Sequence, residues 1–475
     1  MSSTRNWSRR SFLQAASWAA GVDLAGKIVA GRTRAEYPLK WRFQTGLENN
    51  GVIAGEVDGE VRLFLTSEEF YHSSPPPHRG FLTALSASGR QIFKQEADSG
   101  GISVFPNFLE PRGIGPSIFY ASGPSTPGSV GEARLASARD GRIIWSQPTS
   151  NQFFGNGCCV MADVDGDGLE ELVYGDAAAV RCFRARDGKL KWVYDDHIAI
   201  CWGRMACGDI NGDGKPELVL GTEYANEDHS SSLLALDGRG KLLWRKNGIK
   251  GDMGSTPAVI IDVDGDNRPE ILKVELDLEH RAGLPWAGLF CFRGDGTLKY
   301  RADFGCSGMA VGDIDGDGEP EAVGITSTRD GGSLAVDRNE IRCIDLADGK
   351  LKWTTPVSRT WLGSQDPAMA DLSGEGQLDV VVTTSNPSGY GFRKGQPSYG
   401  DAYVVNPHGE IIWKEALPDY ILQPFVSDID RDGRNEIVLA CHDGSVRCYA
   451  APGKPGKLWS VTGANLRRTY CVAGL

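Results

Sequence analysis

A nine-residue pattern of acidic residues and glycines recurs along this 475-residue chain and constrains its fold more than any other feature. The pattern reads Asp-x-Asp-Gly-Asp-Gly-x-x-Glu, with small variations between copies. Six copies occupy residues 163–171, 209–217, 262–270, 313–321, 371–379 and 428–436. Two decayed copies precede them, near residues 56–60 and 110–113, and successive copies begin 46 to 58 residues apart. Such a period indicates one supersecondary unit repeated along the chain.

A second motif follows each copy in phase. It is a glycine turn between alternating residues, and it leads to an aromatic residue. Asp187-Gly188 before Leu190 and Trp192 is typical, and Asp-Gly in this setting predicts a hairpin because glycine accepts a positive φ. The motif ends in Phe93, Trp145, Trp192, Trp244, Tyr300, Trp353, Trp413 and Trp459. Each unit is therefore predicted to form four strands.

Eight four-stranded units arranged radially predict an all-β fold, an eight-bladed β-propeller over residues 36–475, because a ring leaves only short sheet edges exposed. Trp41, within residues 39–43, resembles one more last strand. That strand would close the ring by completing the final blade. Seven blades with irregular ends are the alternative. A linear solenoid is disfavoured, since neither end shows a polar capping unit.

The nine-residue loops have the composition of calcium sites. Oxygen ligands at positions 1, 3 and 5 of a tight loop converge on one point, glycines at positions 4 and 6 permit the bend, and an acid at position 9 closes the shell. A shell of about 6–8 oxygens suits calcium better than magnesium. The sequence predicts about six structural calcium ions, held by Asp163, Asp165, Asp167, Glu171, Asp209, Asn211, Asp213, Glu217, Asp262, Asp264, Asp266, Glu270, Asp313, Asp315, Asp317, Glu321, Asp371, Ser373, Glu375, Asp379, Asp428, Asp430, Asp432 and Glu436.

The first 35 residues predict a cleaved export signal. Residues 8–14 read Ser-Arg-Arg-Ser-Phe-Leu-Gln and precede an alanine-rich apolar run, as in twin-arginine signals. We therefore expect a periplasmic or secreted protein. No run approaches the ~20 apolar residues of a membrane span.

The charge of the chain excludes nucleic acid as a partner. Residues 1–35 carry six basic residues and one acidic residue, so their removal lowers the formal net charge from -12 to -17. A body this acidic repels nucleic acid and anionic lipid. The loop carboxylates account for most of the excess acid, which the predicted calcium would offset.

The cysteines recur with the repeat. Cys182, Cys291, Cys343 and Cys448 share one position in the repeat, which predicts small buried apolar side chains and not disulfides. The adjacent pair Cys158-Cys159 falls within a predicted first strand.

These repeats resemble the FG-GAP and VCBS families of calcium-binding propeller repeats, as in integrin α-subunit heads, through the metal loop over roughly residues 50–460. The tryptophan hairpins are similar to those of eight-bladed quinoprotein dehydrogenases. The loops together with the blade count resemble the propeller of rhamnogalacturonan lyases. This last resemblance implies a polysaccharide lyase-like enzyme that acts on uronate-containing glycans.

The connections opposite the metal loops carry the candidate functional residues, since loops on a rigid scaffold are where binding and catalysis concentrate. A lyase needs a cation for the uronate carboxylate and a base for the adjacent proton. Tyr224 with His229, or His197 with Arg204, would supply such a pair. One alternative is a non-catalytic propeller that binds a carbohydrate or protein on this face. The second alternative is a quinone-dependent dehydrogenase-like protein.

Overall fold

The computed structural model describes residues 36–69, 79–97, 106–122, 131–149, 158–176, 178–200, 205–254, 256–275, 288–328, 338–357, 366–386, 399–419, 421, 423–453, 458–459 and 471–472. The predicted export segment, residues 1–35, lies outside these ranges, as does Arg204. Arg34–Leu475 form one compact unit. No helix is present in the described ranges, and so none there is long and apolar enough to cross a membrane.

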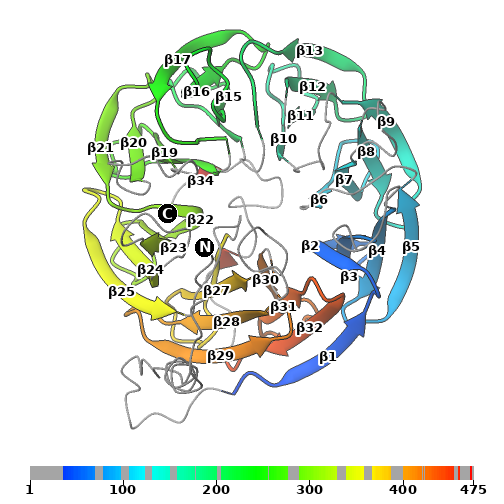
Figure 1. Ribbon diagram of the computed structural model, residues 1–475. Helices are drawn as coiled ribbons and strands as arrows, with labels where there is room; N and C mark the ends of the chain where they lie inside the picture. Colours follow the sequence, from blue (N-terminus) through cyan, green and yellow to red (C-terminus); the bar gives the residue numbers. More distant parts are fainter. Residues whose placement is uncertain are drawn as a thin grey trace, which may run out of the picture. The chain divides into compact units, whose positions relative to one another are not determined.

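The described strands form eight sheets arranged around one centre as the blades of a propeller, and the four strands of each blade are antiparallel (Figure 1). Blade 1 contains β2 (Glu48–Val57), β3 (Glu60–Glu68), β4 (Gly80–Ser86) and β5 (Gln91–Ala97). Blade 2 contains β6 (Asn107–Leu109), β7 (Ser117–Ser122), β8 (Glu132–Ser137) and β9 (Ile143–Pro148). Blade 3 contains β10 (Cys158–Ala162), β11 (Glu171–Gly175), β12 (Val180–Arg184) and β13 (Leu190–Tyr194). Blade 4 contains β14 (Ala206–Gly208), β15 (Glu217–Gly221), β16 (Ser231–Leu236) and β17 (Leu242–Ile249).

The remaining blades follow the same order. Blade 5 contains β18 (Ala258–Ile261), β19 (Glu270–Glu275), β20 (Gly288–Phe292) and β21 (Leu298–Ala302), with β34 (Cys471–Val472) added beside β18. Blade 6 contains β22 (Cys306–Gly312), β23 (Glu321–Thr328), β24 (Arg338–Asp345) and β25 (Leu351–Val357). Blade 7 contains β26 (Ala368–Ala370), β27 (Asp379–Asn386), β28 (Tyr399–Val405) and β29 (Ile411–Leu417), with β33 (Leu458–Trp459) beside β26. Blade 8 contains β30 (Pro424–Ser427), β31 (Glu436–Ala440), β32 (Ser445–Ala450) and β1 (Leu39–Gln44).

The first strand of the chain closes the ring. β1 pairs antiparallel with β32, which places Trp41 opposite Cys448 and makes β1 the outermost strand of blade 8. Figure 1 shows β1, in blue, beside the orange-red β32. The prediction of an all-β, eight-bladed propeller is confirmed, and so is the closure by residues 39–43. The seven-bladed alternative is wrong.

Trp459 does not hold the place predicted for it. β33 pairs with β26 of blade 7 and not with β32 of blade 8. The prediction was wrong because β1 already occupies the outer edge of blade 8, where Ala450 N donates to Pro38 O at 3.0 Å. The ring of Tyr37, which precedes β1, packs against blade 7, with its centroid 5.2 Å from that of Trp413.

The outer-strand aromatic residues join each blade to the next. Trp192 Nε1 donates to Gly238 O at 3.0 Å in the turn between the third and fourth strands of blade 4. Its ring lies against Gly240, where an added Cβ would stand 2.6 Å from ring atoms and where φ is +77°. Both features select glycine. The same contact joins Trp41, Trp145, Trp244 and Trp353 to the turns at Gly89, Gly188, Gly296 and Gly409.

A β-bulge precedes each of these aromatic residues. In blade 3, Cys182 pairs with Trp192 but Phe183 pairs with Leu190, which leaves Lys191 as the extra residue. A bulge turns its extra side chain away from the regular alternation of the strand. The other seven blades show the same register shift in their outer strands.

The core lies between the blades. Each of six buried hydrophobic clusters draws on two or three neighbouring blades. In one of them Val160 and Cys182 of blade 3 pack with Leu218 and Leu234 of blade 4.

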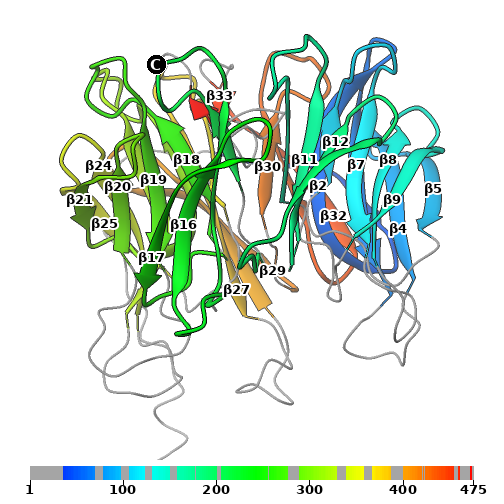
Figure 2. The same ribbon diagram turned by 90° about the horizontal axis from the view of Figure 1, so that it is seen from above.

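The antiparallel order places the connections between first and second strands, which include the nine-residue loops, at the same end of each blade as the aromatic turns. This end is here called the metal-loop face. The other connections lie at the opposite face, and Figure 2 shows the strands running between the two faces.

Candidate functional site

The nine-residue loops join the first and second strands of blades 3 to 8. The carboxylate at position 1 shapes each loop by accepting hydrogen bonds from its backbone. In blade 3, Asp163 Oδ1 accepts from Gly166 N at 2.8 Å, and Oδ2 accepts from Gly168 N at 2.9 Å. Both glycines have positive φ, of 77° and 84°. Asn267 and Arg431 adopt the same conformation at the corresponding positions of blades 5 and 8.

Arg431 replaces a glycine and links its loop to the next blade. Its Nη1 donates to Gly59 O at 3.0 Å, and its Nη2 pairs with Glu56 Oε2 at 2.5 Å. Gly59 and Glu56 lie at the turn between β2 and β3 of blade 1. These contacts offset the conformational cost of a non-glycine residue at φ 62°.

The acid at position 9 is buried at the start of the second strand. Glu171 is 0% exposed, and its Oε2 accepts from Val164 N at 3.2 Å, which ties the loop to the sheet. The same hydrogen bond, between 2.9 and 3.2 Å, is made by Glu217, Glu270, Glu321, Asp379 and Glu436.

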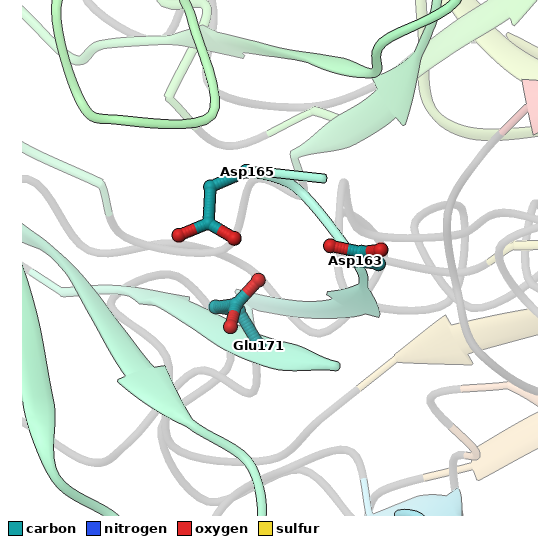
Figure 3. A group of neighbouring side chains, drawn as sticks. All are labelled: Asp163, Asp165 and Glu171. Carbon is teal, nitrogen blue, oxygen red and sulfur yellow. The ribbon is translucent and has the colours of Figure 1, made fainter. Parts of the chain in front are cut away.

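Carboxylates from positions 1, 3 and 9 converge in four loops. In blade 3, oxygen atoms of Asp163, Asp165 and Glu171 lie within 4.8 Å of one another (Figure 3). Equivalent groups are Asp262, Asp264 and Glu270, Asp313, Asp315 and Glu321, and Asp428, Asp430 and Glu436. Oδ1 of Asp165 and Oδ1 of Asp428 are buried, and no donor among the described residues reaches either atom. A carboxylate oxygen buried in this way is stabilised by a cation, and an all-oxygen donor set fits a hard divalent ion.

Blades 4 and 7 carry a neutral residue at position 3. Asn211 Nδ2 donates to Glu217 Oε1 at 2.9 Å, and Asn211 Oδ1 accepts from Asp213 N at 2.8 Å. In blade 7, Ser373 N donates to Asp379 Oδ2 at 2.8 Å. The acids of these two loops are Asp209, Asp213, Glu217, Asp371, Glu375 and Asp379.

Four lysines that the sequence prediction omitted lie on the loop carboxylates. Lys191 Nζ is 2.5 Å from Asp165 Oδ2, 3.2 Å from Asp167 Oδ2 and 2.8 Å from Glu171 Oε1. The corresponding lysines of blades 5, 6 and 8 are Lys299, Lys352 and Lys40. The sequence signal is a lysine directly before the outer aromatic residue, but a regular strand gives no reason to connect it with the loop. The bulge provides that connection.

Burial raises the pKa of five acids at position 9. It raises the pKa of Glu217 to about 7 and that of Asp379 to about 6, although backbone hydrogen bonds oppose the shift. Burial also raises the pKa of Glu171, Glu321 and Glu436, where the pairing lysine opposes it. Negative charge on Glu217 and Asp379 is therefore costly unless a cation is bound.

His197 lies on the opposite face, where β13 leaves blade 3, with 46% of its side chain exposed. Its Nδ1 is 2.7 Å from Asp196 Oδ1. This hydrogen bond, with a further contribution from Arg245, holds the pKa of Asp196 below its ordinary value. Arg245 Nη2 also donates to Tyr194 Oη at 3.1 Å. When Nδ1–H donates to a carboxylate, Nε2 is the nitrogen that accepts a proton.

Tyr224 and His229 lie on the connection between β15 and β16 of blade 4. Tyr224 is half-buried with its hydroxyl oxygen inside the protein, whereas His229 is exposed and adopts a positive φ of 56°. Glu223 N donates to Ala199 O at 2.8 Å, so this connection is joined to the segment that carries His197. Three of the four candidate residues, Tyr224, His229 and His197, therefore lie on two connections that meet between blades 3 and 4, and the fourth, Arg204, is outside the described residues.

The recurring cysteines lie where the repeat places them. Cys182, Cys291, Cys343 and Cys448 are buried thiols on third strands, as predicted. Cys158 and Cys159 lie on β10, and Cys159 is buried.

Comparison with known proteins agrees with the repeat and the fold. A family model described as FG-GAP-like repeat matches residues 163–220 and 209–272. No curated protein matches the chain. The exotype rhamnogalacturonan lyase YesX is similar at a TM-score of 0.55 and 14% identity, over 89% of this chain and 75% of its own. The quinohemoprotein alcohol dehydrogenase from Comamonas testosteroni is similar at 0.53 and 12%, over 88% and 77%.

A third similar structure is Saccharomyces cerevisiae Sqt1, with a TM-score of 0.57 and 10% identity over 87% of this chain and 98% of that chain. At such low identity, all three likenesses show a common fold and leave the activity open. The repeats, by contrast, are recognised from the loops themselves. The chain therefore contains FG-GAP-like repeats, built into an eight-bladed β-propeller.

Proposed function

We propose that the six nine-residue loops bind calcium, and that calcium stabilises the propeller without taking part in catalysis. The convergent carboxylates and the buried oxygens of Asp165 and Asp428 without donors support this proposal. Bound calcium would supply positive charge among carboxylates that the fold has already brought together. Six ions would bring the net charge of residues 36–475 from -17 to about -5.

We propose that the opposite face cleaves a uronate-containing polysaccharide by β-elimination. The observation that carries this proposal is the His197–Asp196 pair beside the connection that carries Tyr224. An ionised Asp196 keeps the proton on Nδ1 of His197 and leaves Nε2 as a base. The imidazole is exposed, as a base that reaches a polymer must be.

We assign the steps of the elimination to different groups, as follows. His197 Nε2 takes the proton from C5 of the uronate, the C4–O4 bond breaks, and a C4=C5 double bond forms. Solvent water gives a proton to the departing O4, because the hydroxyl oxygen of Tyr224 is buried and does not reach a polymer. Arg204, which lies outside the described residues, would neutralise the uronate carboxylate and so stabilise the carbanion-like transition state.

The test measures the ultraviolet absorbance of the unsaturated product with calcium-loaded protein and a set of pectic and other uronate polysaccharides. The native protein is expected to release product, and His197→Asn is expected to reduce the rate by at least about 100-fold. His408→Asn, which changes an exposed histidine on the metal-loop face, is the matched control. A flat trace from native protein with all substrates overturns the lyase proposal and favours the non-catalytic binding propeller.

We propose further that residues 1–35 direct export by the twin-arginine route. The Arg9-Arg10 pair before Phe12-Leu13 supports this proposal. Replacing both arginines with lysine is expected to retain the protein inside the cell, which fractionation would measure. Unchanged export of the lysine variant would contradict it.

A further inference from the structure

The residue at the outer-strand bulge follows the composition of the metal loop. It is a lysine in blades 3, 5, 6 and 8, where position 3 of the loop is aspartate. It is apolar in blades 4 and 7, where position 3 is Asn211 or Ser373, and in blades 1 and 2, which lack the acidic nine-residue pattern. In chain order of the blades the residues are Ile92, Ile144, Lys191, Leu243, Lys299, Lys352, Ile412 and Lys40.

This pairing keeps the charge at positions 1, 3, 5 and 9 of the loops constant. A loop with aspartate at position 3 has four carboxylates at these positions and is paired with one bulge lysine. A loop with Asn211 or Ser373 has three carboxylates at these positions and no bulge lysine. Positions 1, 3, 5 and 9 together with the bulge residue carry a net charge of -3 in both kinds when the carboxylates are ionised, so the lysine compensates the extra aspartate.

The ammonium group occupies the oxygens that a metal ion would use. In blade 6, Lys352 Nζ lies 2.7 Å from Asp315 Oδ2, 3.3 Å from Asp317 Oδ2 and 2.7 Å from Glu321 Oε1. These three residues hold positions 3, 5 and 9. The loop therefore has a cation at its centre before any ion is bound.

The loops of blades 4 and 7, here called lysine-free because their blades have no bulge lysine, have only neutral donors at the same place. The buried Glu217 accepts from the Asn211 amide and from Ile210 N, and the buried Asp379 accepts from backbone N–H groups of Leu372 and Ser373. Within the described part of the chain, neither acid forms an ion pair. A buried carboxylate without a counter-charge is strongly destabilising.

We propose that the bulge lysine is a resident cation that divides the six loops into two classes. The lysine-held loops of blades 3, 5, 6 and 8 keep their shape without metal. The lysine-free loops of blades 4 and 7 depend on a bound divalent cation, and they are the sites at which calcium controls the structure. This inference rests on the proposed calcium binding.

Hydrogen exchange of the full chain, measured by mass spectrometry with calcium and with chelator, tests the two classes. Removal of calcium is expected to speed amide exchange in residues 209–217 and 371–379 by about tenfold or more, and to change residues 163–171 little. Lys191→Met is expected to make residues 163–171 respond to chelator as well. Lys189→Met, which changes an exposed lysine two residues earlier on the chain, is the matched control.

A second, charge-balanced variant tests the inference if Lys191→Met does not fold. Asp165→Asn combined with Lys191→Leu copies the ligand positions of the blade 4 loop and retains their charge of -3. It is also expected to make residues 163–171 sensitive to chelator. Equal responses from all six loops of the native protein, or no response of residues 163–171 in both variants, would overturn the inference. No calcium binding by titration calorimetry, with no exchange difference anywhere, would instead refute the proposed calcium binding itself.

Discussion

Replacing Trp41 with alanine tests whether the N-terminal strand closes the ring. Trp41 is half-buried, and its Nε1 donates to Ala87 O at 2.9 Å. Its ring lies so close to Gly89 that a Cβ there would stand 2.7 Å away. Because Ala87 and Gly89 belong to blade 1 and Trp41 to blade 8, the substitution loosens the joint between the last blade and the first.

The free energy of unfolding is expected to fall by about 3 kcal/mol. Replacing a fully buried tryptophan with alanine costs about 3–5 kcal/mol, and partial exposure reduces this to about 2 kcal/mol. Loss of the Nε1 hydrogen bond adds about 1 kcal/mol. For a unit of about 440 residues, an unfolding entropy of about 2 cal/mol/K per residue converts the loss into a midpoint lower by about 3 °C.

Differential scanning calorimetry of the calcium-loaded full chain measures this shift. Trp192→Ala is the matched control, since Trp192 makes the same contacts with Gly238 and Gly240 between two blades inside the chain. Both variants are expected to unfold at lower temperature by similar amounts. If Trp192→Ala lowers the midpoint and Trp41→Ala leaves it unchanged, β1 is not the outer strand of blade 8, and the reasoning is refuted.

Two further predictions concern a turn and a titration. Gly188→Ala is expected to lower the unfolding free energy by about 1–3 kcal/mol in urea denaturation, because φ is +69° and a Cβ would lie 2.6 Å from Trp145. Gly166→Ala, where φ is also positive but a Cβ would meet open space, should lower it less. Equal losses from the two substitutions would contradict the packing argument. In chelator, the fold is expected to lose up to about 3 kcal/mol as pH rises from 4.5 to about 7, because the raised pKa of Glu217 means that the folded state binds a proton more tightly than the unfolded state. Calcium binds the ionised acid and should therefore reduce this loss. A metal-free protein whose thermal stability rises between pH 4.5 and about 7 would contradict the prediction.

The blades could be predicted from the sequence because each one repeats the same local chemistry. The turn glycines and the outer aromatic residues recur in phase, and the structure shows that they contact one another across blades. The end of the ring could not be predicted in the same way. Trp41 and Trp459 each lie in a strand-like sequence, and only one strand can pair with the free edge of β32. Local sequence does not decide such a competition, since it depends on where the two ends of the chain meet.

The acidic loops could be predicted for a similar reason, since positions 1 to 9 are contiguous in sequence. The lysines could not, because Lys191 lies 20 residues beyond Glu171 and reaches it only through a bulge. An alternating strand pattern contains no sign of that bulge. The contact between the segment that carries His197 and the connection that carries Tyr224 could not be predicted either, because it depends on a backbone hydrogen bond between two connections.

The metal loops also contact the neighbouring blade, so the two lysine-free loops affect how the blades are held together. A Cβ on Gly294 of blade 5 would stand 1.7 Å from Ile210 O in the blade 4 loop, and Gly453 N donates to Leu372 O in the blade 7 loop at 2.8 Å. Each of these loops is thus packed against the chain that follows in the next blade. If blades 4 and 7 alone depend on calcium, its removal should loosen two joints of the ring, between blades 4 and 5 and between blades 7 and 8, and leave the lysine-held joints in place. Calcium would then control the rigidity of the ring at two positions, although acidic loops are present in six blades.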